Sequence, residues 1–157
     1  MTPARAIAYG GLTVAVLDGL DAIVFFGLRN GVGPLQIFNG IAGGLLGREA
    51  AAAGDWPTAL LGVALHFTIA TTIVAVFYLA SRHWPFLVRR PFVWGPIYGI
   101  AVYLQMNFVV LPLSALHAGL PHALPVLLNG ILIHIIGVGT PSALFARAAT
   151  PSTSEDT

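Results

Sequence analysis

The chain contains no cysteine and no lysine, and it has few charged residues of any kind. Without cysteine it can form no disulfide, iron–sulfur cluster or thiolate metal site, and it has no thiol nucleophile. Only 8% of its 157 residues are charged, whereas a soluble domain has roughly 25%. With a net charge of +1 it also lacks the concentrated basic surface that nucleic acids require, so we expect no nucleic-acid partner.

Hydrophobic residues make up 57% of the chain and gather into four long runs. A bilayer core about 30 Å thick needs about 20 apolar residues per helix. The runs are continuous and lack the alternation of membrane β-strands, so we predict an all-α bundle of four transmembrane helices. The predicted spans are residues 6–28, 58–80, 92–113 and 123–146.

Two aspartates interrupt the first run and no cleavage site follows it promptly, so we interpret this run as a retained membrane helix and not as a signal peptide. Residues 1–148 then form a single membrane domain. The polar tail that follows, residues 149–157, is predicted to be disordered.

The first loop contains a further apolar stretch, residues 35–47, with helical spacing at Leu35, Phe38 and Ala42. At about 13 residues it is too short to span a bilayer comfortably. We therefore predict a short re-entrant or interfacial helix in this loop. A fifth span that reaches residue 53 is the alternative.

The arginines are distributed unevenly among the segments between the spans. Two of them, Arg29 and Arg48, lie in the first loop. The other five lie before the first span, in the second loop and after the fourth span: Arg5, Arg82, Arg89, Arg90 and Arg147. Because cytoplasmic segments carry the excess of basic residues, this split predicts that both termini face the cytoplasm.

Seven polar side chains within the spans form the candidate site. Ionisable groups at this depth are costly and need a reason. At a helix rise of about 1.5 Å per residue, the seven lie about 9 to 16 Å below the same membrane face, so all four helices bring polar groups into one layer. They are Asp18, Asp21, His66, Gln105, Asn107, Asn129 and His134.

The two aspartates are three residues apart and therefore share a helix face. Two such carboxylates in a medium of low dielectric constant resist ionising together, which suits proton exchange or cation coordination beside an imidazole. We expect Asp18 and Asp21 to face the bundle interior and to contact His66 or Asn107. The leading hypothesis is a non-enzymatic membrane protein whose polar site binds or passes a proton, cation or small solute.

Two other hypotheses stay open. In the first, the chain is a structural or assembly subunit, and its polar layer only fixes helix pairing through hydrogen bonds. In the second, it is a redox subunit that holds a metal ion through His66, His134, Asp18 and Asp21, or a haem through His66 and His134. No HExxH motif or close histidine pair supports this reading, so we expect neither a metal nor another cofactor.

Gly95 and Gly99 form a GxxxG motif in the third span. This spacing permits close approach of two helices. The partner helix can belong to the same chain or to a second copy, so a homodimer or a larger membrane complex is a possible assembly.

Several stretches resemble a group of small uncharacterised four-helix proteins of proteobacterial inner membranes. They include LLGVALHF, VRRPF, YGIAVYLQMNFVVLPLSAL and NGILIHIIGVGTP, together with the first helix LDGLDAIVFFGLRNG. The resemblance covers nearly the whole chain, to about Arg147. It implies four membrane helices and a bacterial inner-membrane location, and it carries over no role for any residue.

Overall fold

The computed structural model describes residues 1–121 and 123–150, and this part of the chain is helical, with no strand. Short segments of wider π-helix, η1 and η2, interrupt the third and fourth long helices. The elements in chain order are α1 (Pro3–Asn30), α2 (Pro34–Leu46), α3 (Arg48–Ala52), α4 (Trp56–His83), α5 (Phe86–Arg89), α6 (Pro91–Gln105), η1 (Met106–Val110), α7 (Leu111–Leu113), α8 (Leu124–Ile133), η2 (His134–Gly139) and α9 (Thr140–Ala148).

Four continuous helical segments are long and apolar enough to cross a bilayer. They are Pro3–Asn30, Trp56–His83, Pro91–Leu113 and Leu124–Ala148. Each predicted span lies within about three residues of one of them, because the apolar runs themselves determine where these helices can lie. The predicted fold class, an all-α four-helix membrane bundle, is therefore confirmed. The predicted disordered tail lies outside the described residues from residue 151 onward.

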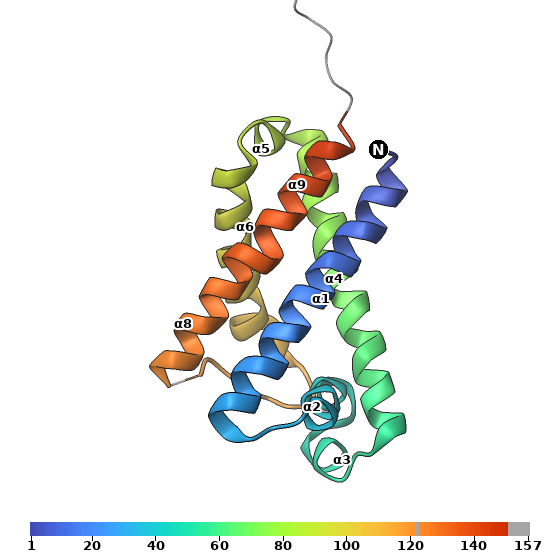
Figure 1. Ribbon diagram of the computed structural model, residues 1–157, viewed down its shortest axis with the longest axis vertical. Helices are drawn as coiled ribbons and strands as arrows, with labels where there is room; N and C mark the ends of the chain where they lie inside the picture. The colour runs from blue at the N-terminus through green and yellow to red at the C-terminus, as the bar shows by residue number, and fades with distance from the viewer. Residues whose placement is uncertain (122, 151–157) are drawn as a thin grey trace, which may run out of the picture.

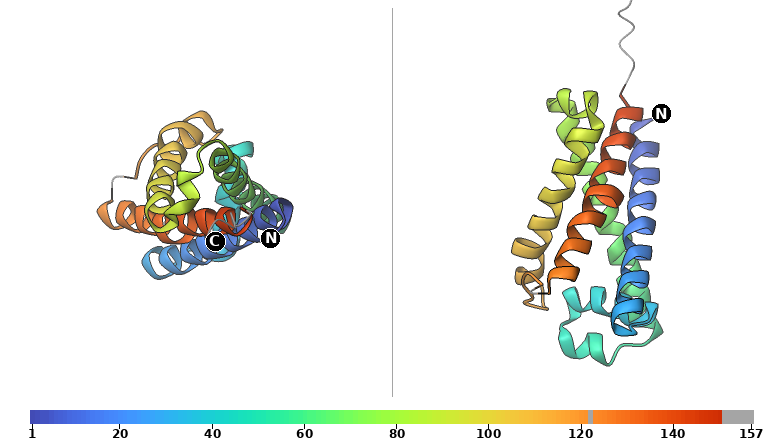
Figure 2. Two further views of the ribbon diagram at one scale, coloured as in Figure 1. Left: turned by 90° about the horizontal axis from the view of Figure 1, so that it is seen from above. Right: turned by 60° about the vertical axis from the view of Figure 1, so that its left-hand side comes forward.

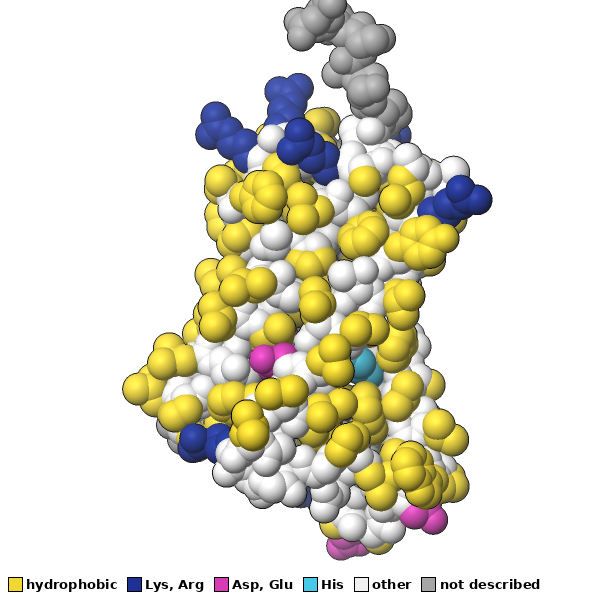
Figure 3. Space-filling view, viewed as in Figure 1, with side chains coloured by type: hydrophobic (Ala, Val, Ile, Leu, Met, Phe, Trp, Pro, Cys, Tyr) yellow, Lys and Arg dark blue, Asp and Glu magenta, His cyan; other side chains and the backbone are white. Residues whose placement is uncertain are grey.

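The distribution of side-chain size supports a membrane protein. The residues buried between helices are mostly small, such as Ala15, Ala70 and Val138. Large apolar side chains cover the outside instead, among them Leu20, Val24, Leu60, Leu79, Phe108, Leu128 and Ile136. Figure 3 shows this apolar surface over the long helices. Small residues at helix contacts and large apolar residues outside are expected where lipid is the solvent.

The fourth segment, α8–η2–α9, runs between α1 and α6 (Figures 1 and 2). Its contact with α6 is so close that a Cβ atom on Gly99 would overlap the carbonyl oxygen of His134, and one on Gly95 would lie 2.8 Å from the Cα atom of Thr140. The GxxxG motif of the third span thus packs against a helix of the same chain.

The helix in the first loop, α2, is seen nearly end-on in Figure 1 and so lies across the bundle axis, beneath α1 and α4. Its backbone at Phe38 is so close to α4 that only a glycine fits at Gly62. The Asn39 amide Nδ2 donates to the Gly54 carbonyl at 2.7 Å, which fastens α2 to the segment leading into α4. The break at Gly47, with φ of 93°, separates α2 from α3, so residues 34–52 do not form one long helix.

Both described ends of the chain lie at the opposite end of the bundle from α2 (Figure 1). The Met1 ammonium donates to the Ala148 carbonyl at 3.0 Å, which joins the start of α1 to the end of α9. Because α5 packs on α4 and α9, its Arg89 lies at this end too.

Candidate functional site

A cavity of about 240 Å³ lies inside the bundle, on the side nearer α2. Four polar side chains reach it from different elements: Asp18 from α1, His66 from α4, Asn107 from η1 and His134 at the start of η2. The rest of its wall is apolar: Val14, Ile41, Ile69, Ala70, Ile73, Met106, Leu111 and Val138. The structure thus brings four of the seven predicted site residues to one cavity.

Both histidines use one ring nitrogen to bond a backbone carbonyl. The Nε2–H of His66 donates to the carbonyl of Ala15 at 2.9 Å, across the contact between α4 and α1. The Nδ1–H of His134 donates to the carbonyl of Gly130, one turn earlier, at 2.8 Å. Because a carbonyl can only accept, these bonds place the protons on those two nitrogens. In the neutral rings, Nδ1 of His66 and Nε2 of His134 are then left as acceptors.

The other two cavity groups also retain acceptors. The Asn107 Nδ2 donates to the Tyr103 carbonyl at 2.8 Å, which leaves its Oδ1 for another partner. The Asp18 carboxyl forms no hydrogen bond or ion pair with any residue in the described part of the chain. An unpaired carboxyl at this depth needs a proton, a cation or water to satisfy it.

The second aspartate belongs to a neighbouring contact. Asp21 Oδ2 accepts a hydrogen bond from Asn129 Nδ2 at 2.7 Å, which joins α1 to α8. Neither residue lines the cavity. The expectation that Asp21 contacts His66 or Asn107 is therefore replaced by this contact with Asn129, because Asp21 is almost one turn further along α1 than Asp18. Figure 3 shows acidic and histidine atoms reaching the surface at about mid-height, among apolar side chains.

Gln105 lies on the exposed surface, away from the cavity. It stands two residues before Asn107, and positions two apart point to different sides of a helix. Asn107 is 8% exposed, so the structure turns this residue inward and Gln105 outward. The depth estimate alone could not distinguish the two.

Sequence reasoning missed the two π-helical segments, each of which carries a polar cavity residue. Asn107 is the second residue of η1 and His134 is the first residue of η2. Single π-turns inside helices are frequent at functional sites. The sequence did carry one sign of these segments, since Pro112 follows η1 and Pro141 follows η2 closely. Proline has no backbone N–H, so it cannot donate the next hydrogen bond of a regular helix.

The histidines are poorly placed for the metal and haem hypotheses. No three His, Asp or Glu side chains in the described ranges are grouped closely enough to hold a metal ion. His66 and His134 do line one cavity, but its volume of about 240 Å³ is not far above the ~150 Å³ of an engineered cavity that accepts a single benzene ring. A porphyrin, with four pyrrole rings, does not fit between them.

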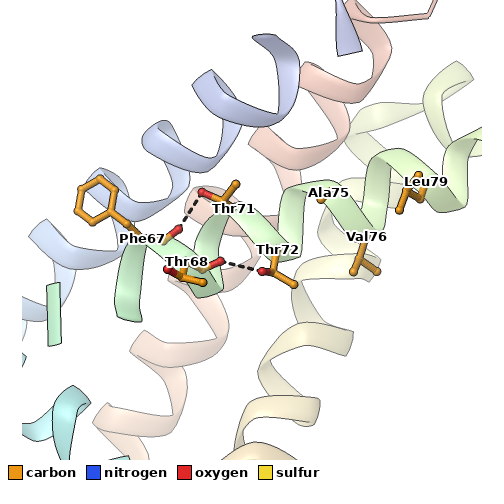
Figure 4. A pocket seen from close by; sticks show the side chains of 7 residues that line it. All are labelled: Phe67, Thr68, Thr71, Thr72, Ala75, Val76 and Leu79. Carbon is orange, nitrogen blue, oxygen red and sulfur yellow. Dashed lines mark hydrogen bonds between the residues drawn. The ribbon is translucent and has the colours of Figure 1, made fainter. Parts of the chain in front are cut away.

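A larger groove of about 540 Å³ lies on α4 alone. Figure 4 shows its wall, from Phe67 to Leu79, with three threonines. Each threonine hydroxyl donates to a carbonyl one turn earlier: Thr68 to Ala64, Thr71 to Phe67 and Thr72 to Thr68, at 2.7 to 2.8 Å. The groove therefore presents three hydroxyls whose protons are already bonded, among apolar side chains, and none of the described residues that line it is ionisable.

Comparisons of the chain with protein-family models, with curated proteins and with solved structures find no match. The resemblance described from the sequence therefore rests on the quoted stretches alone, and the reasoning about function rests on the cavity.

Proposed function

We propose that the protein binds or passes a proton, a cation or a small solute, and that the cavity at Asp18 is the binding site. The observation that carries the proposal is the unpaired Asp18 carboxyl in a cavity whose other polar groups retain acceptors. A site of this kind favours positive charge and disfavours anions. Asp18 bears the charge, and the two histidines and Asn107 orient the ion.

We also propose a location in a bacterial inner membrane, which rests on the sequence resemblance, with both termini in the cytoplasm, which rests on the arginines. The end of the bundle that holds both described ends of the chain also holds Arg5, Arg82, Arg89, Arg90 and Arg147. Beside Arg89 and Arg90, the rings of Phe86 and Trp94 meet edge-to-face at 5.0 Å. Arginines next to aromatic side chains are typical of the cytoplasmic interface. In this orientation α2 lies at the outer face as a re-entrant or interfacial helix and covers the cavity.

The proposal is tested by following the protonated carboxyl itself. Infrared difference spectra between acid and neutral pH are recorded on the protein in lipid nanodiscs. We expect a carboxyl band that Asp18→Asn removes, while circular dichroism shows unchanged helicity because asparagine retains the shape of the side chain. The control is Asp55→Asn, which removes an exposed carboxylate before α4.

A structural or assembly subunit is the second candidate, and specific bonds favour it. His66 and Asp21 both connect α1 to another helix, through Ala15 and Asn129 respectively. If the polar layer only pairs helices, Asp18→Asn leaves pH-dependent spectra and ion movement unchanged. In that case His66→Leu lowers stability, because it removes the bond from His66 to the Ala15 carbonyl that joins α4 to α1.

A further inference from the structure

The polar groups of the cavity select a ligand by charge. Among the described residues, Asp18 is the only acidic one in the cavity wall, and no arginine lines it. Each of the other three polar side chains, His66, His134 and Asn107, retains one hydrogen-bond acceptor. A ligand that brings several hydrogen-bond donors and a positive charge, such as an ammonium group, satisfies these groups together.

The rest of the wall selects an apolar body. Ile69, Ile73 and Leu111 contribute branched aliphatic side chains, and Met106 contributes a polarisable thioether. A bare metal ion or a hydronium ion makes no use of such a surface. A cavity of about 240 Å³ also exceeds the ~150 Å³ that accepts one benzene ring. The ligand therefore has room for one ring or a short branched chain besides its ammonium group.

Helix packing closes several sides of the cavity. Its walls α1 and α4 pack together, as do α1 and η2, and α2 and α4. No comparable packing joins α4 to η1, although both contribute to the wall. Toward the end that holds the termini, α4 and α6 are bridged by Tyr98, whose hydroxyl donates to the Ile73 carbonyl at 2.7 Å. The weakly packed side between α4 and η1 therefore lies below Tyr98, at the depth of the hydrocarbon interior of the bilayer.

We infer that the ligand of this cavity is an organic ammonium ion with an apolar body, and that it reaches Asp18 sideways from the bilayer, between α4 and η1. The inference rests on the proposed cation site and adds the substrate class and the route. An amphiphilic cation concentrates in the membrane, because its apolar part leaves water. Its charged end then meets Asp18 at the depth of the weakly packed side.

The test uses benzylammonium as the probe, with equilibrium dialysis against nanodiscs that hold the protein and against empty nanodiscs. Three matched probes separate its features: methylammonium lacks the ring, benzyl alcohol lacks the charge, and benzoate reverses it. We expect saturable binding of benzylammonium with an affinity at least tenfold higher than that of each of the other three.

Substitutions in the cavity wall test whether benzylammonium binds there. Asp18→Asn is expected to weaken benzylammonium at least tenfold, and Asp18→Glu to retain it within a few-fold, because the charge survives. Ile69→Trp fills the wall beside the weakly packed side and is expected to reduce binding at least tenfold. Its control, Leu60→Trp, places the same ring on α4 at a position that is 65% exposed, and is expected to bind like the unaltered protein.

The outcomes separate this inference from the proposed function. If methylammonium binds as tightly as benzylammonium, and Asp18→Asn abolishes both, the apolar body is refuted and the cation site stands. If no cation binds in an Asp18-dependent way and the carboxyl band is also absent, both fail. If Ile69→Trp leaves benzylammonium binding intact while Asp18→Asn abolishes it, the lateral route is wrong.

Discussion

Replacing Gly99 with alanine tests the closest helix contact in the bundle. A Cβ atom at this position would overlap the carbonyl oxygen of His134 and lie 3.0 Å from the Cα atom of Ile135. Both obstacles are backbone atoms, which cannot rotate away as a side chain can. The substitution therefore requires α6 and η2 to move apart, and this displaces His134 in the cavity wall.

The cost of this movement can be estimated. Adding a methyl group to a packed contact typically costs about 1 to 3 kcal/mol, and a backbone obstacle places Gly99→Ala near the upper end. The better helix propensity of alanine offsets about 1 kcal/mol of this. We expect a net loss of about 2 kcal/mol in the free energy of unfolding, roughly a 30-fold change in the folding equilibrium.

A second glycine supplies the control within the same chain. Gly40 lies in α2, and a Cβ atom there meets nothing within 4 Å. Gly40→Ala should therefore be neutral or stabilising by up to about 1 kcal/mol. Reversible unfolding in mixed micelles with increasing SDS, followed by circular dichroism, measures both variants. If Gly99→Ala unfolds at the same SDS fraction as Gly40→Ala, the close contact of α6 with η2 does not exist as described.

Three further predictions follow from other parts of the molecule. A double-mutant cycle on Asp21→Ala and Asn129→Ala should give a coupling of about 1 kcal/mol in unfolding measurements, because membrane hydrogen bonds contribute that much or less; additive effects would contradict the bond. A reporter fused after Thr150 should be active in the cytoplasm and one inserted after Gly119 in the periplasm, and the opposite pattern would invert the topology. The purified protein should have neither a Soret band nor stoichiometric zinc or iron, as spectroscopy and metal analysis would detect; metal lost with His66→Ala would restore the redox hypothesis.

The fold could be predicted because a bilayer imposes a simple requirement on length and polarity. The run predicted as residues 58–80 becomes the helix Trp56–His83. Its extra residues are Trp56 and Pro57 at one end and Ser81, Arg82 and His83 at the other, which a search for apolar runs leaves out. In the first loop, the pattern of residues 35–47 predicted a helix at α2 (Pro34–Leu46), but it could not give the contact of Phe38 with Gly62, which depends on tertiary packing.

The sequence predicted how deep each site residue lies in the membrane, but only in part which way its side chain points around the helix axis. Helix rise is regular, so the depth of a residue follows from its position in the span. Direction around the helix axis is less secure, because η1 and η2 each contain wider turns that rotate all later residues relative to a regular helix. Asn107 and His134 lie in η1 and η2 and line the cavity, whereas Asn129 lies before η2 and bonds Asp21 instead.

The two ends of the bundle are held together differently, and this difference bears on binding. Toward the termini, Gly10 packs against Val74 and Gly95 against Thr140, at distances that leave no room for a Cβ atom. In lipid, helices associate through such close contacts, since lipid chains are as apolar as the side chains and provide no hydrophobic force to collapse a gap. Nearer α2 a cavity remains between the long helices, although Gly99 still packs closely on His134 in its wall. The polar groups there bond backbone carbonyls of their own or a neighbouring helix. A ligand can therefore occupy the cavity without breaking the contacts that hold the bundle together, so binding should stabilise the protein by about 2.7 kcal/mol at a ligand concentration 100 times the Kd.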